Sequence, residues 1–232
     1  MKKPSLFRIF LVALSWFAIQ EFVPYMSRLF DFQKLEATII AAFGMTLMFL
    51  TTYLYVRGYE KKSFSEGFNF SFKQIGKNII WAFVFSLIAI AVLAGYQLLI
   101  VMPLTKKVVE ASAVAPEGLS KALWERLVEY LYVVYEGVIE VLIFIGFFLD
   151  RLAKRWGWFA AVVSSNLVFA LWHYSYWKKG LLEGTLMVAL TFIAGTFISL
   201  SYLKARNSLS PTICHFLVDS PNAVRELLGM MV

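Results

Sequence analysis

Ionisable side chains inside apolar stretches are the feature of this sequence that could do chemistry. The chain has only two histidines, and both lie in apolar stretches rather than in charged loops. A charged side chain at the centre of a bilayer costs about 2.5–3.5 kcal/mol, so such residues are few and face the protein interior. We therefore predict a polar pocket enclosed by apolar helices. The residues concerned are Glu129, Glu136, Glu140, His173, His215 and Asp219.

Two pairs of these residues are spaced by one helical turn. Glu136 and Glu140 are four residues apart, and so are His215 and Asp219. Residues four apart share one face of a helix, so Asp219 can orient the imidazole of His215. If the helices that carry Glu140, His173 and His215 pack together, a carboxylate and two imidazoles meet in a water-filled pocket.

This set of groups suits hydrolysis. A carboxylate in a bundle can take a proton from water, and a histidine can share that proton or hold the water. A second histidine can stabilise the oxyanion of a tetrahedral intermediate. Two alternatives stay open. Glu140, His173 and His215 could bind zinc with water as the fourth ligand, and buried acids and histidines could form a proton relay in a transporter.

Three short motifs in this part of the chain resemble those of the CaaX protease and bacteriocin-processing family, also called CPBP or Abi. The stretch Glu140–Gly157 is similar to the first motif, which reads Glu-Glu-x-x-x-Arg. Phe169-x-x-x-His173 resembles the second motif, and His215-x-x-x-Asp219 resembles the third. The resemblance runs from about residue 129 to residue 220 and uses both histidines of the chain.

The resemblance implies a polytopic α-helical intramembrane endopeptidase, in a family that includes the type II CaaX prenyl endopeptidase. It implies that Glu140 is the general base and His173 its partner in activating water, with His215 and Asp219 on the oxyanion side. It also implies a glutamate-dependent reaction without a cofactor, acting on a membrane-associated peptide or protein.

Two positions of the first motif depart from the family pattern. Val141 stands in place of the second glutamate, and Ile145 stands in place of the arginine. Glu136 lies on the face of Glu140 and could replace the missing glutamate, whereas Arg151 is too far along the helix. The departures favour an alternative function, an inactive relative that serves as a membrane scaffold or immunity protein.

The third motif ends in Asp219, which the resemblance places on the oxyanion side of the site. An ionised Asp219 would repel an oxyanion, so we expect this carboxylate to support His215 instead.

The composition indicates where these groups lie. Of 232 residues, 60% are hydrophobic and 16% are charged, against roughly 25% charged in a soluble domain. This excludes a disordered chain and favours an integral membrane protein. The net charge of +7 comes from short loops, so we expect contact with anionic lipid and no binding of nucleic acid. A single cysteine, Cys214, excludes an internal disulfide.

Seven apolar segments have about the length of 20 residues that a helix needs to span a bilayer. We therefore predict an all-α polytopic membrane protein, a bundle of about seven to eight transmembrane helices. The segments are Ser5–Phe22, Thr38–Val56, Ile79–Leu104, Leu127–Leu149, Trp158–Trp177, Leu181–Leu203 and Leu209–Met230.

The whole chain, residues 1–232, is predicted to form a single membrane domain. Residues 127–220 would be the CPBP-like catalytic core, and residues 1–126 would be accessory N-terminal helices. The basic start lacks a small-x-small cleavage site, which predicts an uncleaved anchor. The Lys and Arg bias among the loops predicts a cytoplasmic N-terminus in a multi-pass protein of the cell membrane. The oligomeric state does not follow from the sequence.

Overall fold

The computed structural model describes residues 5–29, 34–106 and 123–228, and the elements in these ranges are all helices. The predicted all-α class is therefore confirmed. Segments labelled η1 to η3 are π-helical and η4 is a 3₁₀-helix. In chain order the elements are α1 (Leu6–Leu29), α2 (Lys34–Leu54), η1 (Tyr55–Tyr59), α3 (Phe64–Phe68), α4 (Ile75–Tyr96), η2 (Gln97–Val101), α5 (Met102–Thr105), α6 (Leu123–Glu140), η3 (Val141–Leu149), α7 (Asp150–Trp156), α8 (Trp158–Trp172), η4 (Tyr174–Lys179), α9 (Leu181–Ala205) and α10 (Leu209–Leu228).

Four helical stretches in the described ranges are long and apolar enough to cross a membrane. They are Thr38–Tyr59, Ile75–Thr105, Tyr130–Trp156 and Leu181–Ala205. The count of seven to eight spans stays a prediction. The segment expected at Trp158–Trp177 is divided, because α8 ends at Trp172 and η4 follows. The last expected segment corresponds to α10, and its final residue, Met230, lies outside the described ranges.

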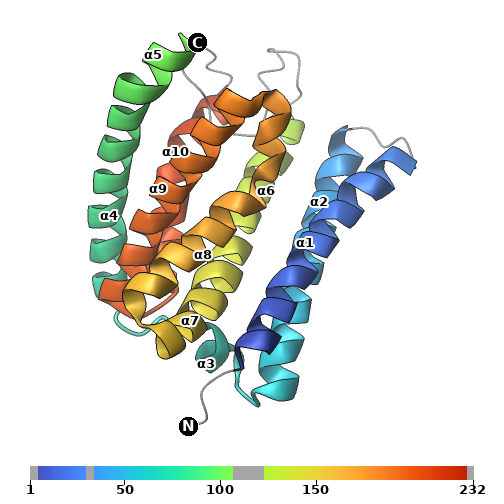
Figure 1. Cartoon of the computed structure of the whole chain (residues 1–232), viewed down its shortest axis with the longest axis vertical. Helices are drawn as coiled ribbons and strands as arrows, with labels where there is room; N and C mark the ends of the chain where they lie inside the picture. The colour runs from blue at the N-terminus through green and yellow to red at the C-terminus, as the bar shows by residue number, and fades with distance from the viewer. Residues whose placement is uncertain (1–4, 30–33, 107–122, 229–232) are drawn as a thin grey trace.

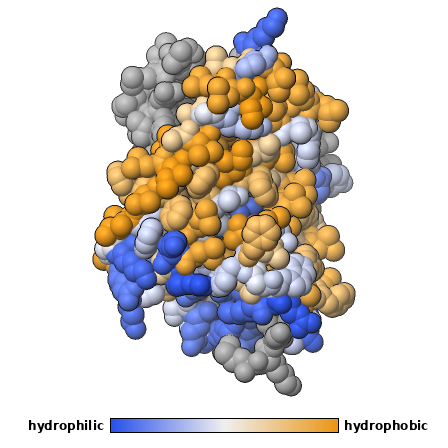
Figure 2. Space-filling view, turned by 60° about the vertical axis from the view of Figure 1, so that its left-hand side comes forward, coloured by the Kyte–Doolittle hydropathy of each residue, from blue (hydrophilic) through white to orange (hydrophobic). Residues whose placement is uncertain are grey.

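The surface is that of an integral membrane protein. Figure 2 shows an apolar belt across the middle of one face, with hydrophilic side chains gathered at its lower end. Large apolar side chains are exposed along α4, among them Ile79, Ile80, Phe83, Leu87 and Ile88. Soluble monomers rarely expose contiguous apolar surface on this scale, so hydrocarbon must cover it.

The helices that carry the candidate site residues lie next to one another in the bundle. Helix α10 packs against α4, α6 and α9, and α8 packs against α9 and η3. Helices α1 and α2 form a hairpin beside this bundle, with α2 in contact with α6 and η3 (Figure 1). Glu140 thus stands at the end of α6, in the middle of the packed elements.

The π-helix η3 is the core of the molecule, because all of its residues are buried. The indole of Trp16, from α1, packs against Phe144 with ring centroids 5.1 Å apart. The Trp16 Nε1–H donates to Thr52 Oγ1 at 2.9 Å, which satisfies the buried donor. The π-turns begin directly after Glu140, and such turns are frequent at functional sites. The N-terminal hairpin therefore packs against the element that follows the candidate base.

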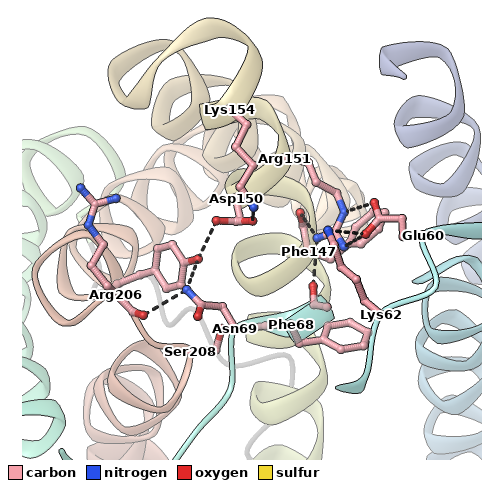
Figure 3. Close-up of polar contacts among 12 residues, drawn as sticks. Glu60, Lys62, Phe68, Asn69, Phe147, Asp150, Arg151, Lys154, Arg206 and Ser208 are labelled. Carbon is pink, nitrogen blue, oxygen red and sulfur yellow. Dashed lines mark hydrogen bonds and ion pairs between the residues drawn. The ribbon is translucent and has the colours of Figure 1, made fainter. Parts of the chain in front are cut away.

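Residues 60–72, here called the anchor segment, lie between η1 and α4 and include α3, and Figure 3 shows polar contacts that they make with Arg151 and Arg206. Arg151 is 1% exposed and donates to both carboxylate oxygens of Glu60, at 2.7 and 2.6 Å. Its Nη1 also donates to the backbone oxygens of Gly67 and Phe147, both at 3.0 Å. Four of the five N–H groups of the guanidinium therefore donate within the protein, and the pair with Glu60 supplies the counter-charge that a buried arginine needs.

The anchor segment also holds the start of α10. The hydroxyl of Ser208 donates to the Phe68 carbonyl at 2.5 Å, and the Asn207 side chain bonds the backbone of Ser71 in both directions. Gly146 of η3 faces the same carbonyl, because a Cβ at Gly146 would lie 2.6 Å from the Phe68 oxygen. The element that directly follows Glu140 and the start of the helix that bears His215 are therefore both fixed against this one segment.

Replacing Glu60 by glutamine should destabilise the protein strongly. Glu60→Gln leaves the buried Arg151 cation without its counter-charge, and such a loss costs about 3–5 kcal/mol. Thermal unfolding in detergent should show a clear fall in Tm. Glu66→Gln is the control, because Glu66 is exposed and glutamine can keep the capping box with Ser63. An unchanged Tm in Glu60→Gln would show that the pair contributes nothing to stability.

The stabilisation by Glu60 should disappear in acid. Burial by itself raises the pKa of Glu60, but the hydrogen bonds and charges of Arg151 and Lys62 outweigh it and hold the pKa below its ordinary value. A depressed folded-state pKa contributes stability above the unfolded pKa of about 4.3, and this is lost as the pH falls through the folded value. The difference in Tm between wild type and Glu60→Gln should therefore shrink below about pH 4. A constant difference from pH 7 to pH 3 would contradict this prediction.

Candidate active site

Glu140 lies at the junction of α6 and η3, and its side chain is enclosed by the bundle. The residue is 4% exposed. Its Oε1 is 3.8 Å from His173 Nε2, and its Oε2 is 3.8 Å from His215 Nε2. Both distances exceed a direct hydrogen bond. The structure therefore brings together one carboxylate and two imidazoles from three different helical segments.

His173 follows the last residue of α8, where the helix changes to η4. Its Nδ1 is 2.9 Å from the backbone oxygen of Phe169, so Nδ1 carries a proton and donates it to that carbonyl. The neutral ring then presents the lone pair of Nε2 towards Glu140. The ring is held between Phe169 and Tyr176, with centroid distances of 5.0 and 5.4 Å. This arrangement fixes both the tautomer and the direction of the imidazole.

His215 lies on α10 and is 7% exposed. Its Nε2 is 3.0 Å from Asp219 Oδ2, one turn further along the same helix. The contact agrees with the expectation that Asp219 supports His215. The other ring nitrogen, Nδ1, is buried and has no hydrogen-bond partner among the described residues. His215 is thus oriented by Asp219 and retains an unused ring nitrogen.

Glu136 lies one turn before Glu140 on α6. It is hydrogen-bonded to Tyr132 and interacts electrostatically with His215. It is therefore close enough to influence the site, as its spacing predicts. Glu129 also lies on α6, but its side chain is outside the described part of the structure.

A small cavity adjoins Glu140 and His215. Its volume is about 10 Å³, roughly what the centre of a single water molecule requires. Apart from Glu140 and His215, the polar side chain in its wall is Asn166. A second, larger cavity of about 210 Å³ lies between α6 and α10, where Gly137 and Asp219 are among its lining residues. The arrangement offers a one-water space beside the carboxylate and an apolar groove next to it.

Val141 and Ile145, which replace the charged residues of the first motif, are both buried and line the small cavity. Arg151 does not reach the site, as expected, because it is bound to Glu60. The wall of the cavity is therefore apolar at the positions where the family pattern has charges.

Sequence reasoning missed Asn166. This residue is a polar side chain in an apolar helix, and it lies seven residues, about two helical turns, before His173, which follows the end of α8. That spacing was the available signal. It also missed the pair of Glu60 and Arg151, because charges at the ends of apolar segments are usually solvated.

The described residues include no group of three or more His, Cys, Asp or Glu side chains arranged to hold a metal ion. The zinc arrangement of Glu140, His173 and His215 therefore gains no support from the described geometry. What this geometry offers is a proton acceptor, two oriented imidazoles and space for one water.

The matched part of the chain includes every one of these site residues. Residues 122–220 match the family model described as type II CAAX prenyl endopeptidase Rce1-like. No curated protein and no solved structure matches the chain. The match confirms the resemblance that the three motifs indicate, since Glu140, His173, His215 and Asp219 all fall within it. Residues 122–220 of this integral membrane protein are therefore similar to the Rce1-like family of type II CAAX prenyl endopeptidases.

Proposed function

We propose that this protein is an intramembrane endopeptidase in which Glu140 and His173 activate water to hydrolyse a peptide bond. The observation that carries the proposal is the convergence of Glu140 with both histidines, each at 3.8 Å, in a buried pocket. Ionisable groups gathered inside an apolar bundle mark functional sites. The match to a family of membrane proteases supports the same reaction.

The proposed reaction follows from the roles that the geometry allows. Glu140 takes a proton from water, with His173 Nε2 accepting a hydrogen bond from the same water. The water oxygen attacks the peptide carbonyl carbon. His215 is protonated on both nitrogens in this step, with Nε2–H held by Asp219, and its Nδ1–H stabilises the oxyanion. As the C–N bond breaks, Glu140 returns its proton to the leaving nitrogen. The products are one carboxylate and one amine.

The substrate that we propose is a membrane-associated peptide or protein. The groove between α6 and α10 is lined mostly by apolar side chains, with Asp219 also in its wall, so it suits an apolar group beside the reacting bond. The protein would work within the lipid bilayer of the cell membrane, with its N-terminus in the cytoplasm, and would bind no nucleic acid.

The test is cleavage of a defined peptide by the purified protein in lipid vesicles. Two peptides are compared by mass spectrometry, one with a farnesylated cysteine near its C-terminus and the same peptide without the lipid. We expect cleavage by wild type and none by His173→Ala. Failure of wild type to cleave either peptide, or equal cleavage by His173→Ala, would contradict the proposal.

We propose that the reaction needs no cofactor, with a zinc-dependent variant as the second possibility. Elemental analysis of the same active preparation distinguishes the two. Activity without a stoichiometric transition metal supports the water mechanism of Glu140. One zinc per chain, with activity lost on its removal, supports the metal variant.

A second candidate function is an inactive relative that acts as a membrane scaffold or immunity protein. The buried, apolar Val141 and Ile145 favour it, because they line the cavity beside Glu140. If these replacements disable the site, Val141→Glu combined with Ile145→Arg should create peptide cleavage that wild type lacks. Turnover by wild type would remove this candidate.

A further inference from the structure

Asn166 is the third polar side chain in the wall of the small cavity, beside Glu140 and His215. It lies on α8 and is 2% exposed. Its Nδ2 is buried and has no hydrogen-bond partner in the described part of the chain. Buried amide donors are almost always paired, so an unpaired one at a cavity wall points to a ligand in that cavity.

The carboxamide of Asn166 is held in one orientation by α9. The hydroxyl of Ser199 donates to Asn166 Oδ1 at 3.1 Å, which leaves Nδ2 as the unused end of the amide. Gly195 makes this approach possible, because a Cβ there would lie 2.8 Å from Asn166 Oδ1. The donor is therefore built into the contact between two helices.

The cavity contains complementary hydrogen-bonding groups for one water molecule. Glu140 Oε1 is a buried acceptor without a hydrogen-bond partner among the described residues, and Asn166 Nδ2 is a buried donor in the same condition. Water can donate to the first and accept from the second at the same time, which leaves one lone pair of its oxygen free to attack. The cavity volume of about 10 Å³ matches this single occupant.

We propose that Asn166 is a further catalytic residue of this site, whose Nδ2–H donates a hydrogen bond to the water that Glu140 deprotonates. The inference rests on the proposed function and adds a group that contacts the attacking oxygen. As the proton passes to Glu140, negative charge develops on that oxygen. A fixed amide donor stabilises this charge in a site that excludes bulk water.

The first test replaces the amide by a side chain of similar size without a donor. Asn166→Leu should lower kcat for the farnesylated peptide by about 100-fold or more, with KM within twofold. Its Tm should fall less than that of the control below, because the only protein hydrogen bond that leucine removes is the one that Asn166 Oδ1 accepts from Ser199. Asn78→Leu is the matched control. Asn78 on α4 is also a buried asparagine, 1% exposed, but it donates to the carbonyl of Lys73, which precedes that helix. This control should lose stability and keep its kcat.

A second variant removes only the donor. Asn166→Asp keeps an oxygen that can accept from Ser199, and it presents an acceptor to the water at neutral pH. Its kcat relative to wild type should rise as the pH is lowered, because a protonated aspartate recovers an O–H donor. A merely structural role would not produce this pH-dependent ratio.

The outcomes separate this inference from the proposed function. If wild type cleaves the peptide and Asn166→Leu keeps kcat within threefold, the inference is wrong and the proposed function stands. A loss of kcat with a fall in Tm as large as in Asn78→Leu, and a pH-independent ratio for Asn166→Asp, also overturns it. No cleavage by wild type overturns both.

Discussion

Glu140→Gln should lower kcat by about 10²–10⁴, the range that a general base contributes. Glutamine fills the same space between His173 and His215, but it cannot accept a proton from water. The fold should persist, because neither oxygen of Glu140 makes a direct hydrogen bond to these histidines. Initial rates on the farnesylated peptide in vesicles measure the effect.

The matched control for this prediction is Glu66→Gln. Glu66 is exposed in α3 and caps that helix with Ser63, a role that glutamine can keep. It should retain the wild-type kcat. If Glu140→Gln and Glu66→Gln turn over peptide equally fast, Glu140 is not the base.

His215→Ala is expected to produce the second large effect. Removing one oxyanion donor from a preorganised site typically lowers kcat by about 10²–10³. His215 is buried and is oriented by Asp219 at 3.0 Å, so its loss removes a fixed donor rather than a mobile one. The measurement is kcat together with KM, because an oxyanion donor acts on the transition state and should leave KM nearly unchanged.

The variant Asp219→Asn distinguishes two roles of Asp219, which are orienting the ring of His215 and contacting the reacting group directly. Asparagine keeps an oxygen that can accept from His215 Nε2. We expect a loss of less than tenfold, well below that of His215→Ala. A loss as large as that of His215→Ala would mean that Asp219 itself contacts the reacting group.

Much of the site could be predicted from the sequence because of the cost of burying charge. Glu140, His173 and His215 are ionisable groups in apolar stretches. A charged side chain that faces lipid has a high free energy. The bundle interior is the favourable location for these three side chains, and it is where the structure brings them together. The spacing of His215 and Asp219 likewise predicts the contact that the structure contains.

Other features depend on packing that periodicity does not encode. The segment Trp158–Trp177 has uniform hydropathy, so the end of α8 at Trp172, which directs His173 into the site, could not be read from it. The π-helical form of η3 depends on tertiary packing, including the Ser165 hydroxyl that donates to the Phe144 carbonyl at 2.7 Å. The Glu60 and Arg151 pair joins segments far apart in the chain, and charge counting assigns both residues to solvated loops.

The central claim is that water activated by Glu140 cleaves a peptide bond inside this bundle. The most direct measurement is the mass spectrum of the peptide products that wild type and Glu140→Gln form in water enriched in ¹⁸O. We predict that wild type releases a product whose new carboxylate carries one ¹⁸O atom and that Glu140→Gln releases almost none. Equal amounts of labelled product from both proteins, or none from wild type, would contradict the claim.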